Sequence, residues 1–307
     1  KMNLNPINQC KLYGYGNILS TLNNLYNQSI LPNKILFSGQ KAMGKSTLAY
    51  HLINCILSKG EDYEYDIENF EINSNNRSYL LTQNGSNPNF NLIDVLPDKK
   101  NIDIQQIRSL INLMNKSSFN DKLRFILIDN IEFLNLSSIN SLLKFLEEPN
   151  DNICFILIHN NTKILPTLKS RCINFKFFFS NYEAIDIANK LTNIDVKNEI
   201  NSDLLHYYLS PGKIYKLLEF SKNHEFDLKK LTLKKLLKKI INENTYKKDY
   251  VFKNLFYELI ESFLRNTPHL IYSDYTNYYL RKINHVKKYN LDEESFFIEF
   301  DSKLLNG

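Results

Sequence analysis

Cysteine is scarce in this sequence, and its few occurrences are scattered. Cys10, Cys55, Cys154 and Cys172 never form the closely spaced pairs that a structural zinc site needs. No apolar run approaches the roughly 18 residues that span a bilayer, and residues 1–16 lack the continuous apolar core of a signal peptide. We therefore expect reduced thiols, no bound zinc, no membrane segment and a cytoplasmic location.

Internal repeats and long low-complexity linkers are also missing, so the 307 residues are expected to form globular domains. Domains of about 150 residues are typical, which predicts two or three of them. The net charge of +5 is unevenly placed, because residues 222–248 hold nine lysines and only three acidic residues. Within this stretch, residues 228–241 have leucines at helical spacing. A solvated helix face and a phosphate-binding surface both explain such a pattern.

The first half of the chain has an α/β pattern. From Pro32 to about Phe177, short apolar runs alternate with helical periods, as in a parallel sheet with helices on both faces. The expected strands are Lys34–Ser38, Asn91–Leu96, Arg124–Asp129, Cys154–His159 and Ile173–Phe178. The expected helices between them are Lys45–Ser58, Ile104–Asn115 and Ser137–Leu146, the last of them ended by Pro149. The stretch Asn73–Asn91 is rich in Asn and Ser and is expected to be an exposed loop.

After Phe178 only helical patterns remain. The expected helices are Asn181–Leu191, Asp203–Leu209, Gly212–Lys222, Leu228–Ile241, Tyr250–Asn266, Ser273–Tyr289 and Glu293–Leu305. We therefore predict three domains: an α/β domain over residues 1–178, a small helical domain over 179–225, and an all-helical domain over 226–307.

The sharpest motif runs from Gly39 to Thr47 and fits the pattern G-x4-GK[ST]. It follows an expected strand and opens an expected helix, which is the setting of a P-loop. Its glycines, Gly39 and Gly44, let backbone N–H groups wrap phosphates. Lys45 would reach the β- and γ-phosphates, and Ser46 would ligate Mg²⁺. The motif predicts binding of a nucleotide such as ATP, with Thr47 completing the pattern.

A P-loop protein also needs a carboxylate near its magnesium ion. The apolar run from Phe125 ends in Asp129, and this residue is our candidate. Ser46 and Asp129 are thus the two predicted protein ligands of Mg²⁺.

Several motifs resemble one family. Residues 140–149 read NSLLKFLEEP and residues 170–172 read SRC, which resemble signatures of the bacterial clamp-loader subunits of the AAA+ class. The stretches LPN (31–33), NPN (87–89) and IDIQQIR (102–108) resemble the delta-prime type of subunit. The resemblance covers about residues 10–220. It implies an AAA+ domain followed by a helical lid and a helical collar that assembles the complex.

The resemblance also implies roles and partners. Arg171 of the SRC motif would enter the ATP site of a neighbouring subunit as an arginine finger. The partners would be gamma/tau and delta subunits in a hetero-pentamer, with the sliding clamp and primer-template DNA reached through the complex. An Arg paired with a surface carboxylate is the alternative interpretation of Arg171.

Departures from the family pattern are informative. Asn130 stands where active motor subunits carry a Glu that polarises water, and an amide cannot accept a proton, so hydrolysis by the chain alone should be slow or absent. Gly212 stands where motors carry the sensor 2 Arg, with Lys213 beside it as a substitute contact to nucleotide. Sensor 1 falls at His159 or Asn160. Residues 59–90 lack the cysteines of the zinc module found in many relatives.

A P-loop also occurs in proteins of two other functional classes. A self-sufficient gamma/tau-type ATPase motor would need the groups that Asn130 and Gly212 replace. An unrelated P-loop enzyme, such as a kinase, would need a catalytic base and a substrate hydroxyl site, and it would leave the LLK-x-LEEP segment unexplained.

Overall fold

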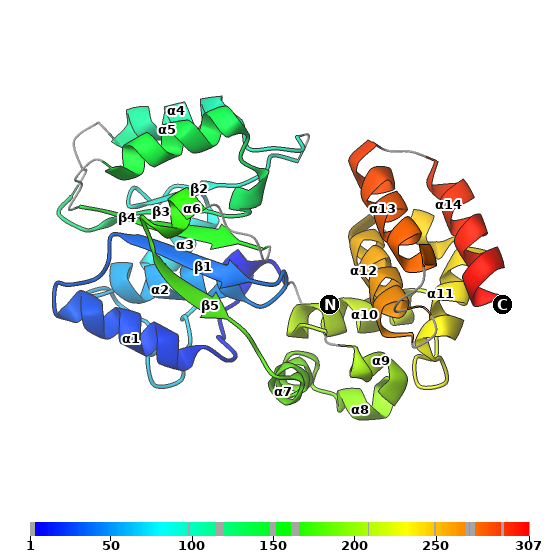
Figure 1. Ribbon diagram of the computed structural model, residues 1–307. Helices are drawn as coiled ribbons and strands as arrows, with labels where there is room; N and C mark the ends of the chain where they lie inside the picture. Colours follow the sequence, from blue (N-terminus) through cyan, green and yellow to red (C-terminus); the bar gives the residue numbers. More distant parts are fainter. Residues whose placement is uncertain are drawn as a thin grey trace. The chain divides into compact units, whose positions relative to one another are not determined.

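The computed structural model describes residues 4–97, 99–114, 120–147, 152–160, 166–207, 209–248, 250–267, 270, 274–289 and 292–306. They form two compact units that meet in sequence between Ser180 and Asn181 (Figure 1). The α/β pattern lies in the first unit and the helical pattern in the second. The predicted division of the second unit into two domains at residue 225 stays a prediction.

The first unit is built on a five-stranded parallel sheet in the order β2-β3-β4-β1-β5. Its strands are β1 (Lys34–Gly39), β2 (Phe90–Ile93), β3 (Arg124–Ile128), β4 (Ile153–His159) and β5 (Ile173–Phe177). The central strands are continuous apolar runs because helices bury both of their faces. The parallel sheet and each expected strand are confirmed, within a few residues at the ends.

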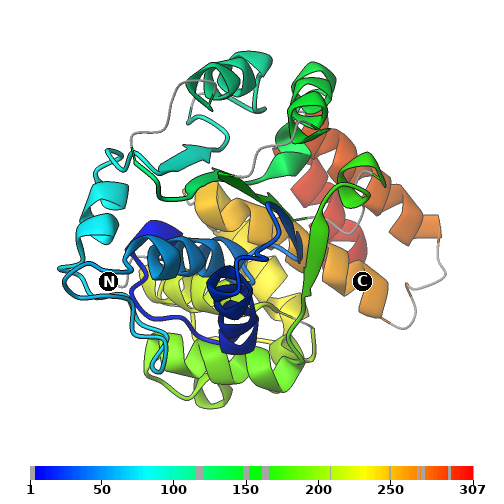
Figure 2. The same cartoon turned by 90° about the vertical axis from the view of Figure 1, so that its left-hand side faces the viewer.

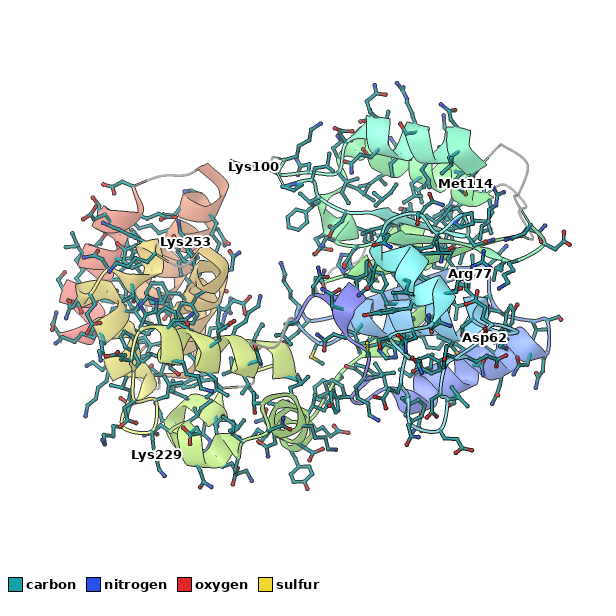
Figure 3. All side chains as sticks on the ribbon, turned by 180° about the vertical axis from the view of Figure 1, so that it is seen from behind. Asp62, Arg77, Lys100, Met114, Lys229 and Lys253 are labelled. Carbon is teal, nitrogen blue, oxygen red and sulfur yellow. The ribbon has the colours of Figure 1, made fainter. Side chains whose placement is uncertain are left out.

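Helices cover both faces of this sheet (Figures 1 and 2). One face carries α1 (Gly16–Asn27), α2 (Lys45–Leu57) and α3 (Arg77–Gln83); the other carries α4 (Ile104–Met114), α5 (Leu136–Glu147) and α6 (Pro166–Lys169). Along β1, Ile35 and Phe37 pack into the first core and Leu36 into the second, as the alternation of a strand requires. Arg77 and Met114, labelled in Figure 3, mark the start of α3 and the end of α4.

The exposed loop expected over Asn73–Asn91 is wrong, because this stretch contains helix α3. Asn76 is completely buried and caps the helix, accepting a hydrogen bond from the Tyr79 N–H at 2.8 Å. The same oxygen accepts from Asn54 of α2 at 2.8 Å. An Asn-rich composition is typical of loops, but here the amides of Asn76, Asn87 and Asn89 are buried and hydrogen-bonded.

Short turns complete the first unit. They are η1 (Pro6–Asn8), before α1, and η2 (Ile131–Phe133), which follows β3. Helix α5 ends at Glu147; Pro149, which was expected to end it, and Glu148 of the LEEP motif lie outside the described residues.

All the secondary structure described in the second unit is helical. It comprises α7 (Asn181–Thr192), α8 (Val196–Glu199), α9 (Ser202–His206), α10 (Pro211–Asn223), α11 (Leu233–Asn242), η3 (Thr245–Lys247), α12 (Tyr250–Asn266), α13 (Asp274–Tyr289), α14 (Glu293–Phe300) and η4 (Asp301–Leu305). Aromatic rings fill its core: Phe220 of α10 stacks on Phe252 of α12 with ring centroids 3.6 Å apart. Nowhere in the described chain is there a helix of the length and apolarity that crossing a membrane requires.

The lysine-rich helix begins later than expected. Leu228 lies in a turn, and α11 starts at Leu233 because Thr232 caps it by accepting a hydrogen bond from the Lys235 N–H. The leucines and isoleucines of α11 are buried, as the amphipathic pattern predicts. Some of the neighbouring lysines have acidic partners: Lys230 lies 2.7 Å from Asp227 and Lys247 lies 3.1 Å from Glu294.

Candidate nucleotide-binding site

The P-loop joins the carboxyl end of β1 to the first turn of α2. Gly39 ends the strand where β5 runs alongside, and a Cβ atom there would lie 2.6 Å from the backbone oxygen of Phe177. Gly44 caps α2 with a φ of 82°, a left-handed conformation that glycine adopts without strain. Both predicted glycines are therefore required by the backbone. The first N–H groups of an α-helix have no partner in the helix's own hydrogen-bond ladder, so the start of a helix such as α2 suits an anion.

Lys45 places a buried positive charge in this loop. The residue is only 3% exposed, and its Nζ donates to the Gly39 carbonyl at 3.1 Å and to the Gln40 carbonyl. The carbonyls satisfy the ammonium without neutralising its charge. A phosphate group can therefore replace them as the stronger partner.

Ser46 and Asp129 meet, although 83 positions separate them in sequence. The Ser46 hydroxyl donates to Asp129 Oδ2 at 2.6 Å, and the Asn130 N–H donates to Oδ1 at 2.7 Å. Burial raises the pKa of Asp129 and the nearby Asp94 raises it further, whereas the Ser46 and Asn130 hydrogen bonds and Lys45 oppose the rise. The predicted pair of magnesium ligands thus lies together.

Few protein ligands are available to a metal here. The described residues contain no group of three or more His, Cys, Asp or Glu side chains that could hold a metal ion. Mg²⁺ commonly uses one or two protein oxygens and completes its shell with phosphate oxygens and water. Ser46 and Asp129 fit that kind of site, and phosphates at Lys45 would supply further ligands.

Side chains from three strand ends are linked by hydrogen bonds. The Asn130 amide donates to Asp94 Oδ1 at 2.8 Å and accepts from the Asn160 amide at 2.9 Å. The backbone N–H of Asn160 donates to Glu132 Oε2 at 3.2 Å. Asn160, one of the two sensor 1 candidates, is therefore connected to the position where a motor would carry its Glu. His159, the other candidate, is buried at the end of β4.

Asp94 was missed by the sequence analysis. It follows β2, the strand that pairs with β3, and so it comes to the same edge of the sheet as Asp129. Tyr50 of α2 is sensitive to both carboxylates: burial raises its pKa, and Asp129 and Asp94 add to the rise. The expected strand Asn91–Leu96 enclosed Asp94, whereas β2 ends at Ile93 and leaves this carboxylate at the edge where parallel strands end.

Arg171 lies in the turn between α6 and β5 and is paired within the chain. Its Nε donates to Glu147 Oε1 at 3.0 Å, Nη2 contacts the same oxygen, and Nη1 donates to the Thr167 carbonyl at 2.9 Å. Its side chain is 32% exposed. Both interpretations of Arg171 are compatible with this geometry, since an ion pair at the surface can be exchanged for another anion.

Two further predicted contacts are Thr47, within the P-loop motif itself, and Lys213. Thr47 occupies the third position of α2 and is half-buried. Lys213 lies on α10 of the second unit, where its Nζ is 2.6 Å from Glu258 of α12. Its role as a nucleotide contact stays a prediction.

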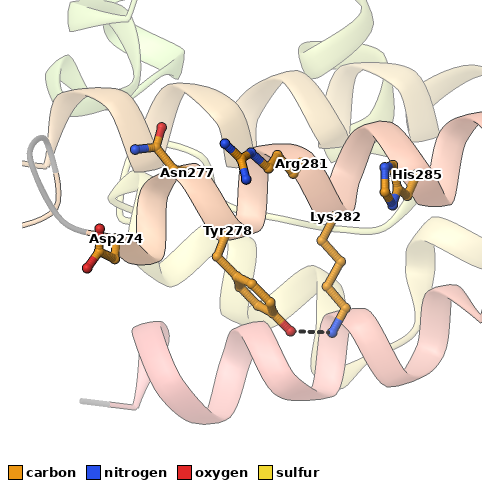
Figure 4. Close-up of a pocket in the computed structure, with 6 residues that line it drawn as sticks. All are labelled: Asp274, Asn277, Tyr278, Arg281, Lys282 and His285. Atoms are coloured by element: carbon orange, nitrogen blue, oxygen red, sulfur yellow. Dashed lines mark hydrogen bonds between the residues drawn. The ribbon is translucent and has the colours of Figure 1, made fainter.

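A hollow also lies along α13 (Figure 4). Its walls are polar side chains at helical spacing, and Lys282 donates to the Tyr278 hydroxyl at 3.2 Å. The residues are Asp274, Asn277, Tyr278, Arg281, Lys282 and His285. Lys282 is also paired with Glu299 of α14. These side chains do not form a recognisable catalytic or ligand-binding arrangement, so the P-loop remains the candidate site.

A family model and several curated relatives that match this chain are all named as subunits of DNA polymerase III. The family model described as "DNA polymerase III, delta subunit" matches residues 14–180. The gamma subunit of DNA polymerase III from Buchnera aphidicola subsp. Schizaphis graminum is 28% identical over 197 residues, which is 63% of this chain and 50% of that protein. The delta' subunit from the same organism is 26% identical over 278 residues, 82% of this chain and 79% of that protein.

Other relatives are matched over smaller parts of their length. The delta' subunit from Bacillus subtilis is 26% identical over 230 residues, 68% of this chain and 66% of that protein. The chain spans half or less of the first curated relatives it matches, at 50%, 31% and 27%. Among solved structures, a gamma subunit-related protein from Thermotoga maritima aligns with 92% of this chain and 97% of that chain, with 19% identity and a TM-score of 0.47.

Proposed function

Because the chain belongs to the DNA polymerase III delta subunit family of clamp-loader proteins, we propose that it binds ATP and Mg²⁺ at its P-loop and serves as a delta-prime-like loader subunit. The observation that carries the proposal is the meeting of Ser46 with Asp129 at 2.6 Å beside the buried Lys45. This arrangement supports nucleotide binding independently of the relatives' names.

ATP binding would reorganise contacts that are already in place. Lys45 exchanges the carbonyls of Gly39 and Gln40 for β- and γ-phosphate oxygens, and the start of α2 receives the phosphates. Ser46 and Asp129 would hold Mg²⁺, which would supply positive charge against the phosphates. Asn160 and Lys213 are the further contacts that we assign to the nucleotide.

Hydrolysis by this site should be slow. The Asn130 amide can orient a water molecule but cannot take its proton. The amide nitrogen of Asn130 also donates to Asp94, and its amide oxygen accepts from Asn160. Bound ATP would then stabilise one arrangement of subunits, so that the chain acts as a switch and scaffold.

Within the assembled loader, Arg171 would complete a neighbour's ATP site. The proposed partners are gamma/tau-like and delta-like subunits in a hetero-pentamer, which opens a sliding clamp and closes it around primed DNA. An arginine finger accelerates hydrolysis by stabilising charge that develops on the γ-phosphate in the transition state.

Two measurements test this function. The purified chain should bind ATP without appreciable turnover, and Lys45→Ala should abolish the binding. In the reconstituted loader, Arg171→Ala should lower DNA-stimulated hydrolysis at the one ATP site that Arg171 completes by about 10³-fold. Lys169→Ala removes an exposed positive charge two positions earlier and should leave that rate unchanged. An unchanged rate in Arg171→Ala would refute the finger.

A motor of the gamma/tau type is the second candidate, and the presence of gamma subunits among the relatives favours it. Steady turnover by the purified chain that disappears in Lys45→Ala would establish this alternative in place of the switch.

A further inference from the structure

Contacts within the chain occupy most of the N–H groups of the Arg171 guanidinium. One edge, formed by Nε and Nη2, lies on Glu147 Oε1. The other, at Nη1, donates to the Thr167 carbonyl at 2.9 Å and lies 3.4 Å from the Ser170 hydroxyl. An arginine arranged in this way cannot offer the edge on Glu147 to a phosphate without first releasing the carboxylate.

We propose that Glu147 is a restraining partner of Arg171, which holds the arginine in the free chain and is displaced by the polyphosphate of a neighbouring subunit. The inference rests on the proposed function of Arg171 as a finger. It assigns to Glu147 a task in regulating that contact: the arginine becomes available only where a competing anion is present.

The chemistry of the pair suits an exchange. Carboxylate and phosphate oxygens both accept paired hydrogen bonds from a guanidinium, so the same edge of Arg171 serves either partner. The Thr167 carbonyl holds only Nη1, which leaves that contact intact while Nε and Nη2 change partners. The exchange therefore needs rotation of one side chain and no rearrangement of the sheet.

The environment of Glu147 makes its hold on Arg171 weak. The two side chains are 32% and 56% exposed, and ion pairs exposed to that extent shift an equilibrium by up to about fivefold. Glu147 is also the last residue of α5, where the negative end of the helix disfavours a carboxylate. Polyphosphate with its higher charge is the stronger competitor for Arg171.

The experiment measures how readily the chain activates a neighbour. The full-length chain is titrated into gamma/tau-like and delta-like subunits with clamp and primed DNA, and ATP hydrolysis is followed. Glu147→Gln should lower the half-saturating concentration by about two- to fivefold at an unchanged plateau, because a larger fraction of the chain has Arg171 available. Arg171→Ala and the double variant should both lack the stimulation.

A matched control makes the same Glu→Gln change at a residue that does not contact Arg171. Glu68→Gln neutralises an exposed carboxylate in the loop between α2 and α3 and should titrate like the wild type. If Glu147→Gln has the same half-saturating concentration as the wild type while Arg171→Ala gives no stimulation, the restraint is refuted and the finger stands. A lower plateau in Glu147→Gln refutes the restraint too, since Glu147 would then be needed to aim the arginine.

Failure of the proposed function is recognised separately. Wild-type stimulation by Arg171→Ala refutes the finger, and with it any restraint acting on the finger. A measurement on the free chain covers the case in which Glu147→Gln assembles poorly. The ¹⁵N-detected Nε–H resonance of Arg171 should shift when Glu147 is replaced, and it should stay in place in Glu68→Gln. An Nε–H chemical shift of Arg171 that is unchanged in Glu147→Gln would overturn the proposal.

Discussion

The ionised side chain of Asp129 lowers the free energy of unfolding of the chain. Burial and the nearby Asp94 raise its pKa, which means that the folded chain penalises the ionised carboxylate that Mg²⁺ requires. Asp129→Asn should therefore stabilise the free chain at neutral pH, by on the order of 1 kcal/mol, and weaken magnesium-dependent ATP binding. Urea unfolding and nucleotide titration measure the two effects.

The pH dependence of this effect has a definite sign. A carboxyl whose pKa is raised on folding binds a proton more readily in the folded state, so it lowers stability as pH rises above the ordinary value of 3.8. The advantage of Asp129→Asn should be largest at neutral pH and fade as the pH falls toward 3.8. Asp121→Asn, at an exposed position, should change stability by less than about 0.5 kcal/mol at either pH.

Ala42 carries local strain in the P-loop. Its φ of 62° is left-handed, a conformation that is unfavourable for a residue with a Cβ. Ala42→Gly should raise the free energy of unfolding by about 0.5–1 kcal/mol, since the relief of strain outweighs the added freedom of the unfolded chain. Ala49→Gly, in the buried interior of α2, should lower it by about 1 kcal/mol or more, and thermal unfolding distinguishes the two. Destabilisation by both changes would contradict this account.

Helix α2 depends on a buried histidine that joins it to two other segments. His51 Nδ1 lies 2.8 Å from the Tyr65 hydroxyl, and Nε2 lies 3.1 Å from the Gln9 carbonyl. Nε2 must carry the proton that Gln9 accepts, so Nδ1 accepts from Tyr65. Burial lowers the pKa of His51 to about 4, although the Gln9 carbonyl favours the charged form.

The lowered pKa makes the packing of α2 sensitive to acid. The unfolded chain binds a proton at His51 below pH 6.5 and the folded chain only near pH 4, so stability is complete above 6.5 and lost as the pH falls toward 4. Between pH 7 and 5 this residue should account for a loss of about 2 kcal/mol in urea unfolding. His51→Gln should have a lower free energy of unfolding at pH 7 than the wild type, and that free energy should change less between pH 7 and 5.

Elements with a periodic pattern or a motif could be predicted from sequence, and those that depend on distant partners could not. The apolar strands and the P-loop before α2 follow from local pattern. Helix α3 does not, because its cap Asn76 is buried against Asn54 of another helix, a contact that no local pattern specifies. The start of α11 was also predicted wrongly. Thr232 caps the helix, and hydrophobic periodicity alone does not reveal where a cap ends the helical pattern.

The candidate site shows the same division. Ser46 and Asp129 were predictable because strand and loop motifs place both at the carboxyl edge of a parallel sheet. Asp94 required the strand order, since only the pairing of β2 with β3 brings it to Asn130. The pairing of Arg171 with Glu147 required side-chain conformations, which no spacing of residues specifies.

At the scale of the whole molecule, the first unit has the means to fold alone. Its end is anchored by aromatic packing: Phe179 stacks on Tyr15 with centroids 4.3 Å apart, and Phe177 meets the same ring at 4.5 Å. A fragment of residues 1–180 should therefore unfold cooperatively in urea, as followed by near-ultraviolet circular dichroism of its tyrosines.

A shorter fragment provides the control. Residues 1–175 lack Phe177 and Phe179 and so lose two buried rings next to Tyr15. This fragment should be less stable by at least about 3 kcal/mol, the usual loss for one buried aromatic side chain. Equal stability of the two fragments would show that the unit ends earlier in the sequence.

The unequal burial of the four thiols makes the native chain suitable for labelling at one position. Burial raises the pKa of Cys55 and Cys172 to about 11 and that of Cys154 to about 12, so these sulfurs have almost no reactive thiolate at neutral pH. Cys10 is only half-buried, and its sulfur lies 3.4 Å from the Tyr79 hydroxyl of α3. A maleimide dye would attach there without engineering and place a fluorescent reporter against the face of the first unit that carries α3.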